Sequence, residues 1–294
     1  MACEQYLERR FQKHSLVMID RVNQIIAEYH EGRGLALIVR QIHYQFVARG
    51  WQANTSARYG ALVYAITNGR DAGLIDWDAI EDRSRAIQRV STWRNPEQIL
   101  AAAAASYRED LWATQPRHIE IWVEKDSLAG MFDAVHRDYR VPIYPHRGGD
   151  STTNIRAAGV RLAEKIELGA EPLILLFNDH DPAGWTMRRD IPERLEFYAR
   201  QPIEVRVLGL TMEQVRRLQP PSNFAKEKDP NHEAYIREFG TEECWELDAL
   251  PPDLFDQLAR GVIEAELDHE AWRRALAREA RNRRKLTPKK GQRR

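Results

Sequence analysis

The spacing of hydrophobic residues changes from a helical to a strand-like pattern near residue 118. Upstream, apolar residues recur every three or four positions, as at Leu16, Ile19, Val22 and Ile26, which predicts amphipathic helices. Downstream, short apolar runs rich in β-branched residues alternate with helical patterns, which predicts strands. The expected strands are HIEIWV (118–123), VPIY (141–144), PLILLF (172–177) and IEVRVLGL (203–210).

Three helical patterns connect these strands, at Ser127–Tyr139, Ser151–Leu168 and Ala183–Arg200. Strands that alternate with helices form right-handed βαβ units on a parallel sheet, so residues 113–220 are expected to form an α/β domain. In an open sheet of this kind, ligands bind beyond the carboxyl ends of the strands, where the strand order reverses. If the strand order is 2-1-3-4, the first and third strands are neighbours at that point.

Residues 1–112 are expected to form a separate helical domain. Residues 35–50 fit a buried helix that ends in glycine, and residues 54–70 begin with N-cap side chains and continue as a second helix. A short extended stretch follows at 72–82. Helix, turn, helix and a short extended segment is the order of a winged-helix DNA-binding domain.

Two further helical regions flank the predicted sheet. The connector at 95–117 contains an alanine-rich helix, Leu100–Ser106. Residues 221–294 form the third region, in which Glu242–Arg284 is expected to contain two helices separated by a pair of prolines. A basic tail follows.

Composition indicates a globular chain with a buried core. The chain has 294 residues, enough for two modest domains, and is 43% hydrophobic and 30% charged. No apolar stretch approaches the roughly 20 residues of a membrane helix, and MACEQYLERR lacks the apolar region of a signal peptide. Cys3 and Cys244 are too few for a disulfide framework or a thiolate zinc site. These features predict a cytoplasmic protein with reduced cysteines.

The formal net charge of zero hides a basic C-terminal segment. Residues 273–294 hold eleven lysines or arginines and a single acid, Glu279. The rest of the chain therefore carries 33 basic and 43 acidic groups, a net charge of −10. A basic tail on an acidic body fits contact with nucleic acid. A solvated helix end followed by a disordered tail explains the same composition.

Acidic residues directly follow the first and third expected strands. Glu124 comes after HIEIWV, and Asp179 and Asp181 come after PLILLF. If those strands are neighbours, the three carboxylates face one cleft, and a cation would offset their repulsion. Carboxylate oxygens suit Mg²⁺, which leaves room for a substrate phosphate. Asp181 before Pro182 also fits a helix N-cap, so a structural role explains this aspartate equally well.

The loop after the second strand, HRGGDSTTN (146–154), is a candidate phosphate contact. Gly148 and the glycine after it allow close backbone approach, and Arg147 adds a positive charge. Ser151 would cap the next helix, whose N-terminus suits an anion. His180, between the two aspartates, is expected to be a solvent-facing turn residue and not a metal ligand.

Together these motifs resemble the Toprim domain, which topoisomerases, primases and a family of nucleases share. The shared features are a glutamate after one strand, a glycine loop after the next, and D-x-D-P-x-G after a third. The form NDHDPAG is most similar to the A subunit of topoisomerase VI and its meiotic double-strand-break relatives. The resemblance covers about residues 118–210 and implies a Rossmann-like Toprim fold for 113–220. It implies that Glu124, Asp179 and Asp181 bind the metal. It also implies structural roles for Pro182 and Gly184.

In the same A subunits, a winged helix precedes the Toprim domain and carries the nucleophile, in a motif similar to Arg-x-Ile/Leu-Tyr-Tyr. Residues 40–44 read Arg-Gln-Ile-His-Tyr, so Arg40, Ile42 and Tyr44 match while His43 replaces the first tyrosine. The resemblance implies that Tyr44 attacks a phosphodiester and that Arg40 contacts DNA. His43 is a conceivable base, although adjacent helical side chains point about 100° apart. A core or interface tyrosine on an amphipathic helix fits the same position.

These observations leave three functions open. The first is a Mg²⁺-dependent enzyme of the topoisomerase VI A-subunit type, a homodimer that cleaves double-stranded DNA, with Tyr44 closer to a partner's acids than to its own. The sequence shows no Walker A loop, so strand passage would need a separate ATPase subunit of the B type. The second is a hydrolytic Toprim nuclease that uses metal-activated water. The third is a non-catalytic winged-helix DNA-binding protein, against which the intact acidic triad argues.

The stretch ELDAL (246–250) resembles a short acidic segment late in the same A subunits. It precedes a proline pair and an expected helix, so helix-start chemistry explains Glu246 and Asp248 as well. No catalytic role is therefore assigned to these two acids.

Overall fold

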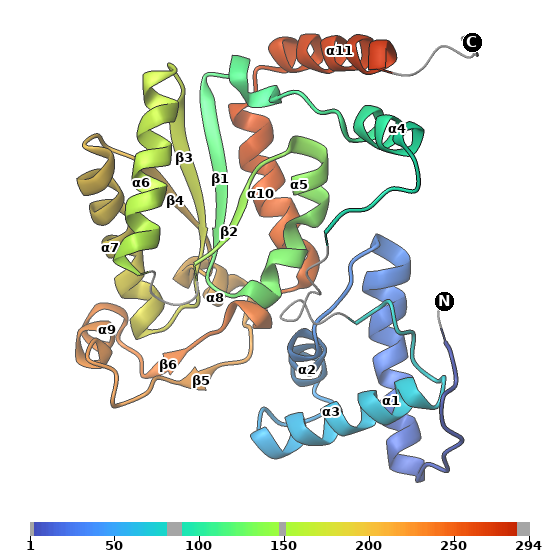
Figure 1. Cartoon of the computed structure of the whole chain (residues 1–294). Helices are drawn as coiled ribbons and strands as arrows, with labels where there is room; N and C mark the ends of the chain where they lie inside the picture. Colours follow the sequence, from blue (N-terminus) through green and yellow to red (C-terminus); the bar gives the residue numbers. More distant parts are fainter. Residues whose placement is uncertain (1–2, 81–89, 147–150, 287–294) are drawn as a thin grey trace.

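A computed structural model describes residues 3–80, 90–146 and 151–286 of the chain. The protein is an α/β structure in which a four-stranded parallel sheet lies between helical segments (Figure 1). Within the described residues, no helix is both long and apolar enough to cross a membrane.

The sheet has the strand order β2-β1-β3-β4 with parallel neighbours, which confirms the expected order. Its strands are β1 (Arg117–Val123), β2 (Ile143–Pro145), β3 (Glu171–Phe177) and β4 (Glu204–Gly209). β1 and β3 pair along their whole length and are buried on both faces, which explains their nearly continuous apolar sequences. Because Val123 lies opposite Phe177 at the carboxyl end, the residues that follow the two strands meet there.

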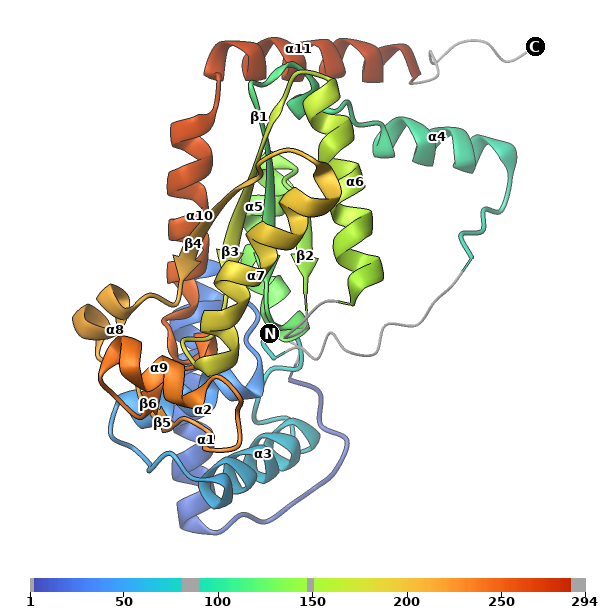
Figure 2. The same cartoon turned by 90° about the vertical axis from the view of Figure 1, so that its left-hand side faces the viewer.

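Helices cover both faces of the sheet and form a core on each (Figures 1 and 2). One face carries α5 (Asp133–Tyr139) and α10 (Pro252–Glu266), and the other carries α6 (Thr152–Glu167) and α7 (Pro182–Ala199). Successive side chains of β3 point to opposite faces, as in any strand. Leu173 and Leu175 join the core of the first face with Phe255, while Ile174 and Leu176 join the core of the second.

The N-terminal region has a core of its own, formed by three helices. They are α1 (Lys13–Ile26), which continues as the π-helical turn η1 (Ala27–Glu31), α2 (Val39–Ala48) and α3 (Ser56–Asp71). Thr55 caps α3 by accepting a hydrogen bond from the backbone N–H of Arg58 at 3.3 Å, as the cap pattern predicts.

The expected wing is not established by the described residues. After α3, residues 72–80 are mainly turns, with one parallel bridge between Leu37 and Ile80. Residues 81–89 lie outside the described residues. The order of helix, turn and helix is therefore present, while the winged helix stays a prediction.

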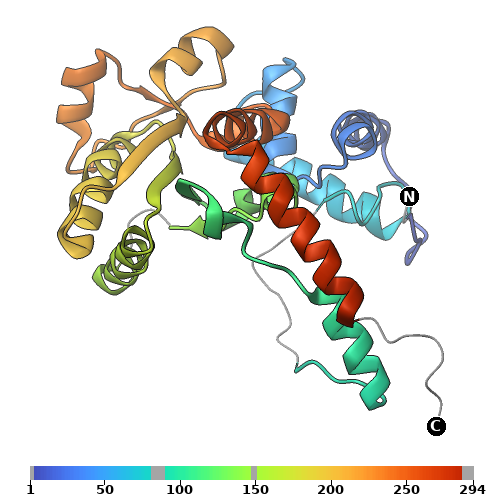
Figure 3. The same ribbon diagram turned by 90° about the horizontal axis from the view of Figure 1, so that it is seen from above.

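The remaining elements connect and flank these parts. They are α4 (Pro96–Ser106), η3 (Leu111–Thr114), η4 (Asp126–Phe132), α8 (Met212–Leu218), β5 (Asn223–Phe224), α9 (His232–Phe239), β6 (Glu243–Cys244), η5 (Leu247–Ala249) and α11 (His269–Leu286). The helix expected at Ser127–Tyr139 is 3₁₀-helical in its first half, η4. Helices α4 and α11 lie side by side beyond the amino end of the sheet (Figure 3). The antiparallel pair β5–β6 and η5 lie at the opposite, carboxyl end.

The described part of the basic C-terminal segment is a helix that packs through one face and is otherwise exposed. Residues 273–286 belong to α11, in which Glu279 is buried and accepts hydrogen bonds from Arg140 Nη2 at 3.0 Å and from the backbone N–H of Glu109 at 2.8 Å. Three of its arginines form ion pairs with acids of the same chain: Arg274, Arg278 and Arg283. Three of the eleven basic residues of the segment are therefore paired within the chain, and residues 287–294 lie outside the described residues.

Candidate functional site

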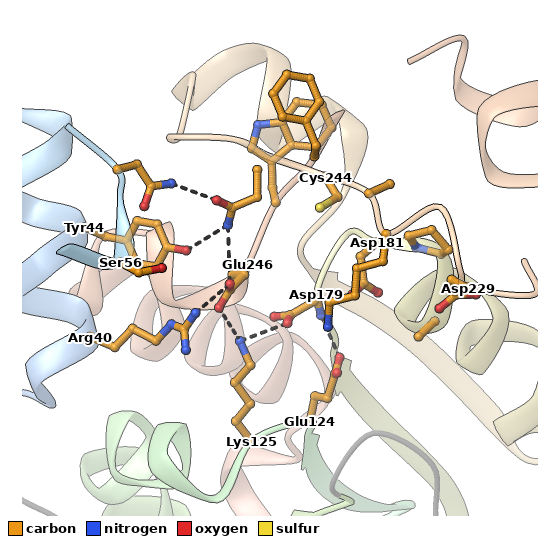
Figure 4. A pocket seen from close by; sticks show the side chains of 18 of the residues that line it. Arg40, Tyr44, Ser56, Glu124, Lys125, Asp179, Asp181, Asp229, Cys244 and Glu246 are labelled. Atoms are coloured by element: carbon orange, nitrogen blue, oxygen red, sulfur yellow. Dashed lines mark hydrogen bonds and ion pairs between the residues drawn. The ribbon is translucent and has the colours of Figure 1, made fainter. Parts of the chain in front are cut away.

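A pocket of about 1000 Å³ opens beyond the carboxyl ends of β1 and β3 (Figure 4). Acids that follow the two strands line one side, helices α2 and α3 line another, and the β5–β6 segment lines a third. Five of the predicted site residues line this pocket: Arg40, Tyr44, Glu124, Asp179 and Asp181. The other two, Arg147 and Gly148, lie outside the described residues. The tyrosine and the acids of one chain thus line one pocket, and the expected approach of Tyr44 to a partner's acids stays a prediction.

Glu124 and Asp179 are in direct contact at the strand ends. The backbone N–H of Asp179 donates to Oε2 of Glu124 at 2.9 Å, and the N–H of Glu124 donates to the carbonyl of Phe177 at 2.9 Å. Burial, and then the charge of Asp179, raise the pKa of Glu124 to about 7. Burial likewise raises the pKa of Asp179 to about 6. A bound cation would stabilise both carboxylates in their ionised form.

Lys125 is the cation that the chain itself supplies to this cluster. Its Nζ lies 2.8 Å from Asp248, 2.9 Å from Asp179 and 3.0 Å from Glu246. Burial alone would lower the pKa of Lys125, but the three carboxylates raise it above its usual value. The lysine therefore stays charged and neutralises the side of Asp179 that faces away from Glu124 (Figure 4).

Asp181 acts as the helix cap that its position before a proline allows. Its Oδ1 accepts a hydrogen bond from the N–H of Gly184 at 2.7 Å, and Pro182 occupies the first turn of α7. A Cβ added at Gly184 would lie 2.2 Å from the carbonyl oxygen of Asp179, so the close helix start requires glycine. This geometry explains the structural roles that the resemblance implies for Pro182 and Gly184.

The donor chemistry of the strand ends fits a hard cation, with Glu124 and Asp179 as its first ligands. Glu124 accepts the backbone N–H of Asp179, and burial raises the pKa of both carboxyl groups, so a positive charge beside Glu124 would favour its ionised form. Across residues 3–80, 90–146 and 151–286, no three His, Cys, Asp or Glu side chains are arranged closely enough to form a complete metal cage. Mg²⁺ commonly uses one or two carboxylates and keeps waters or substrate phosphates as its other ligands, so a pair of carboxylates is compatible with it.

Tyr44 lies across the pocket from these acids, on α2. It is 2% exposed, and its hydroxyl accepts a hydrogen bond from Nδ2 of Asn223 at 3.2 Å. Burial, and then the charge of Glu246, raise the pKa of Tyr44 to about 12, while the guanidinium of Arg40 acts in the opposite direction. Asn223 also accepts a hydrogen bond from Nδ2 of Asn54 at 2.9 Å, so strand β5 ties α2 to the start of α3.

Glu246 and Asp248 connect the tyrosine side of the pocket to the acidic side. Arg40 Nη2 donates to Oε1 of Glu246 at 2.8 Å, and its Nε lies 3.9 Å from Asp248. The same two carboxylates bind Lys125. Sequence reasoning left ELDAL without a role and did not select the lysine after Glu124. The sequence showed only two acids shortly before a proline-initiated helix, which did not specify their partners.

His43 does not contact the Tyr44 hydroxyl through either ring nitrogen. Its Nε2 lies 3.2 Å from Oδ1 of Asn54, and its Nδ1 lies 2.7 Å from Nε2 of Gln52. Burial lowers the pKa of His43, which favours the neutral ring. The imidazole therefore orients the turn between α2 and α3, and the geometry gives it no direct part as a base for Tyr44.

The expectation of a solvent-facing His180 is wrong. The side chain is buried, with Nδ1 2.7 Å from the hydroxyl of Tyr235, and its backbone exchanges hydrogen bonds of 2.8 and 2.9 Å with Trp245. The β6 segment covers this turn, which the local sequence could not reveal. His180 thus anchors the C-terminal segment beside the two aspartates.

Searches of protein-family models, curated proteins and solved structures find no match to this chain. Functional interpretation therefore rests on the motifs and on the geometry of the pocket. The pocket combines a buried tyrosine, an arginine beside it, and a carboxylate pair suited to a cation.

Proposed function

We propose that the protein is a Mg²⁺-dependent DNA-cleaving enzyme of the topoisomerase VI A-subunit type, with a winged helix and a Toprim domain. The observation that supports this most directly is that Tyr44 lines the same pocket as Glu124, Asp179 and Asp181. These residues come from separate elements, α2 and the ends of β1 and β3.

In the proposed reaction, Tyr44 Oη forms a bond to the scissile phosphorus as the bond from phosphorus to the leaving sugar oxygen breaks. The tyrosyl proton passes to solvent, and the leaving oxygen takes up a proton. Arg40 lowers the pKa of Tyr44, although burial raises it. Arg40 also lines the pocket, where its guanidinium would bind the substrate phosphate. Glu124 and Asp179 would hold Mg²⁺, with Asp181 beside them, and the ion would offset the charge that develops on the phosphate.

The resemblance extends the proposal to partners. A homodimer would cut both strands of double-stranded DNA, and a separate ATPase subunit of the B type would be needed for strand passage. The protein would act in the cytoplasm. Arg40, Arg147 and Gly148 would contribute DNA contacts near the cut.

A hydrolytic Toprim nuclease is the second candidate, and the state of Tyr44 favours it. A tyrosine that is 2% exposed with a pKa of about 12 is a poor nucleophile until the substrate changes its surroundings. In a hydrolase, water activated by the metal would attack, and Tyr44 would only shape the pocket.

Cleavage of supercoiled plasmid distinguishes the candidates. The protein is incubated with plasmid and Mg²⁺, the reaction is stopped with detergent, and the products are compared before and after protease treatment. Protein-linked ends support the transesterase, and free ends support the hydrolase. Uncut DNA with shifted mobility would contradict both enzymes and favour the non-catalytic binding protein.

Tyr44→Phe tests the nucleophile directly. The change removes the hydroxyl and keeps the ring, so a transesterase must lose all protein-linked cleavage while the protein stays folded. Tyr29→Phe is the matched control, because Tyr29 is a buried tyrosine of the same region whose hydroxyl donates to Gln45 at 3.4 Å and does not line the pocket. A cleaving Tyr44→Phe protein ends the transesterase proposal and leaves the nuclease.

A further inference from the structure

Phe224 is a large apolar side chain that the protein leaves in water at the edge of the pocket. It is 79% exposed and lines the pocket from strand β5. Its neighbour in the same strand, Asn223, donates the hydrogen bond to the Tyr44 hydroxyl. An exposed phenylalanine contributes nothing to the core, so its position one residue from the tyrosine contact needs another explanation.

The depth of Tyr44 limits what can reach it. A phosphate must enter the pocket to meet a hydroxyl on a side chain that is 2% exposed. A pocket of about 1000 Å³ lies at the upper end of the range for small-molecule sites, roughly 300–1000 Å³, which suits a few nucleotides of one strand. An intact duplex, whose major groove alone is about 12 Å wide, does not fit inside it. A single strand that has separated from its complement near the tyrosine would fit.

Groups that can bind phosphate line the same pocket as Phe224. Arg40 and Lys226 line the pocket, and Lys226 is exposed two residues after Phe224. The first turn of α3 contributes Thr55 and Ser56, and a helix N-terminus is favourable for an anion. Proteins that bind single-stranded nucleic acid combine positively charged side chains along the phosphate backbone with aromatic side chains on which the bases stack.

We propose that the substrate is DNA with unpaired bases at the cut site, and that Phe224 stacks on one of those bases. The stacked base would hold the strand so that its phosphate enters between Arg40 and the strand-end acids. The inference rests on the proposed function in taking DNA as the ligand, but it concerns binding and does not require cleavage.

Binding without metal tests this proposal separately from catalysis. In EDTA, fluorescence anisotropy measures the affinity for three labelled DNAs of one sequence: a single strand, the matched duplex, and a duplex with a central unpaired bubble. The expected order is tighter binding of the single strand and the bubble than of the duplex. Phe224→Ala removes the ring on which one base would stack. It should therefore weaken binding of the single strand and of the bubble by about 5- to 150-fold, which corresponds to about 1–3 kcal/mol.

The matched controls separate stacking from general effects. Phe224→Trp should retain the affinity, because a larger ring stacks at least as well. Phe197→Ala, at a position that is 74% exposed on α7 and outside the pocket, should leave all three affinities unchanged. The salt dependence should also be unchanged in Phe224→Ala, since no charge is removed.

Two results would overturn the stacking proposal: wild-type affinity in Phe224→Ala, or an equal loss of affinity for duplex and single strand. Either can occur in a protein that cleaves plasmid, in which case the proposed function stands without it. If Phe224→Ala selectively loses affinity for DNA with unpaired bases while the wild type shows no cleavage, the stacking proposal stands and the cleavage proposal fails.

Discussion

Glu120 is buried within β1 and Glu124, four residues later, is half-buried just beyond it, and their environments are opposite. Glu120 accepts hydrogen bonds from Arg161 at 2.9 and 3.0 Å and from Trp122 at 2.9 Å, and lies 3.2 Å from His118. Although burial raises its pKa, the hydrogen bonds from His118 and Arg161 lower it to about 2. Its charge is fully compensated, so its role is structural.

Glu124 has far less compensation. Its carboxylate accepts the backbone N–H of Asp179, but that aspartate's own charge opposes its ionisation, and the pKa is raised to about 7. The comparison teaches that burial alone does not mark a functional carboxylate. What distinguishes the two is the directly hydrogen-bonded positive partner, which Arg161 supplies to Glu120, whereas the charge of Asp179 opposes the ionisation of Glu124.

The largest expected effect is on cleavage. Glu124→Gln should lower the rate of Mg²⁺-dependent DNA cleavage about 1000-fold or more, equivalent to about 4 kcal/mol, because a metal ligand loses its charge. Glu120→Gln, assayed at a temperature where it is folded, should stay within about tenfold of the wild type. Equal losses in the two variants would remove the proposed difference between these glutamates. Glu124 is a cleaner target than Asp179, whose Oδ1 also accepts the N–H of Leu247 at 2.8 Å.

The effects of the two substitutions on stability should be in the reverse order, with the larger loss in Glu120→Gln. Glu120→Gln should lower the free energy of unfolding by about 3 kcal/mol, because the buried hydrogen bonds to Trp122 and Arg161 lose their charged acceptor. Glu124→Gln should leave this free energy unchanged or raised in EDTA, since it removes a repulsion. Urea denaturation at pH 7.5 measures both. A stability loss in Glu124→Gln as large as that in Glu120→Gln would show that Glu124 is structural.

The pH dependence of stability should differ in sign between the two sites. The raised pKa of Glu124 means that its contribution is complete below pH about 4.5 and is lost as the pH rises through about 7. The depressed pKa of Glu120 means that its contribution is present above pH about 4.5 and is lost as the pH falls toward 2.

Without metal, the wild type should therefore lose about 2 kcal/mol relative to Glu124→Gln between pH 4.5 and 8. Urea denaturation across this range in EDTA, repeated with Mg²⁺, provides the measurement. Mg²⁺ should reduce the loss if Glu124 is a ligand. A difference between the two proteins that does not vary with pH would contradict the raised pKa.

The smallest expected effect concerns Asp181, which combines a cap with a proposed place beside the metal. Asp181→Ala should cost about 1 kcal/mol of stability through loss of the cap on α7. Asp181→Asn should retain the cap and the stability but lower Mg²⁺-dependent cleavage, because only the charge is lost. Thermal unfolding and plasmid cleavage on both variants separate these effects. Full cleavage by Asp181→Asn would leave the aspartate with the capping role alone.

Local sequence was sufficient for the sheet and for the acids at its ends. The apolar runs of β1 and β3 predict buried strands, and intervening helical patterns make the connections parallel and right-handed. Residues that directly follow two neighbouring parallel strands must then share one edge of the sheet. The meeting of Glu124 and Asp179 therefore followed from the sequence once the strand order was given. The cap at Asp181 was also a local property.

Only the tertiary structure decided which charges are compensated. Lys125 acquires Glu246 and Asp248 as partners from a segment more than a hundred residues away, and Arg40 joins the same acids from the N-terminal helices. His180 is buried because Trp245, the residue after β6, pairs with its backbone. The physical reason is that helical and strand periodicities depend on neighbouring residues, whereas Coulomb interactions and burial depend on distance in space. The sequence could therefore place the acids at one edge, but the packing of distant segments determined that the pKa of Glu120 is lowered and that of Glu124 is raised.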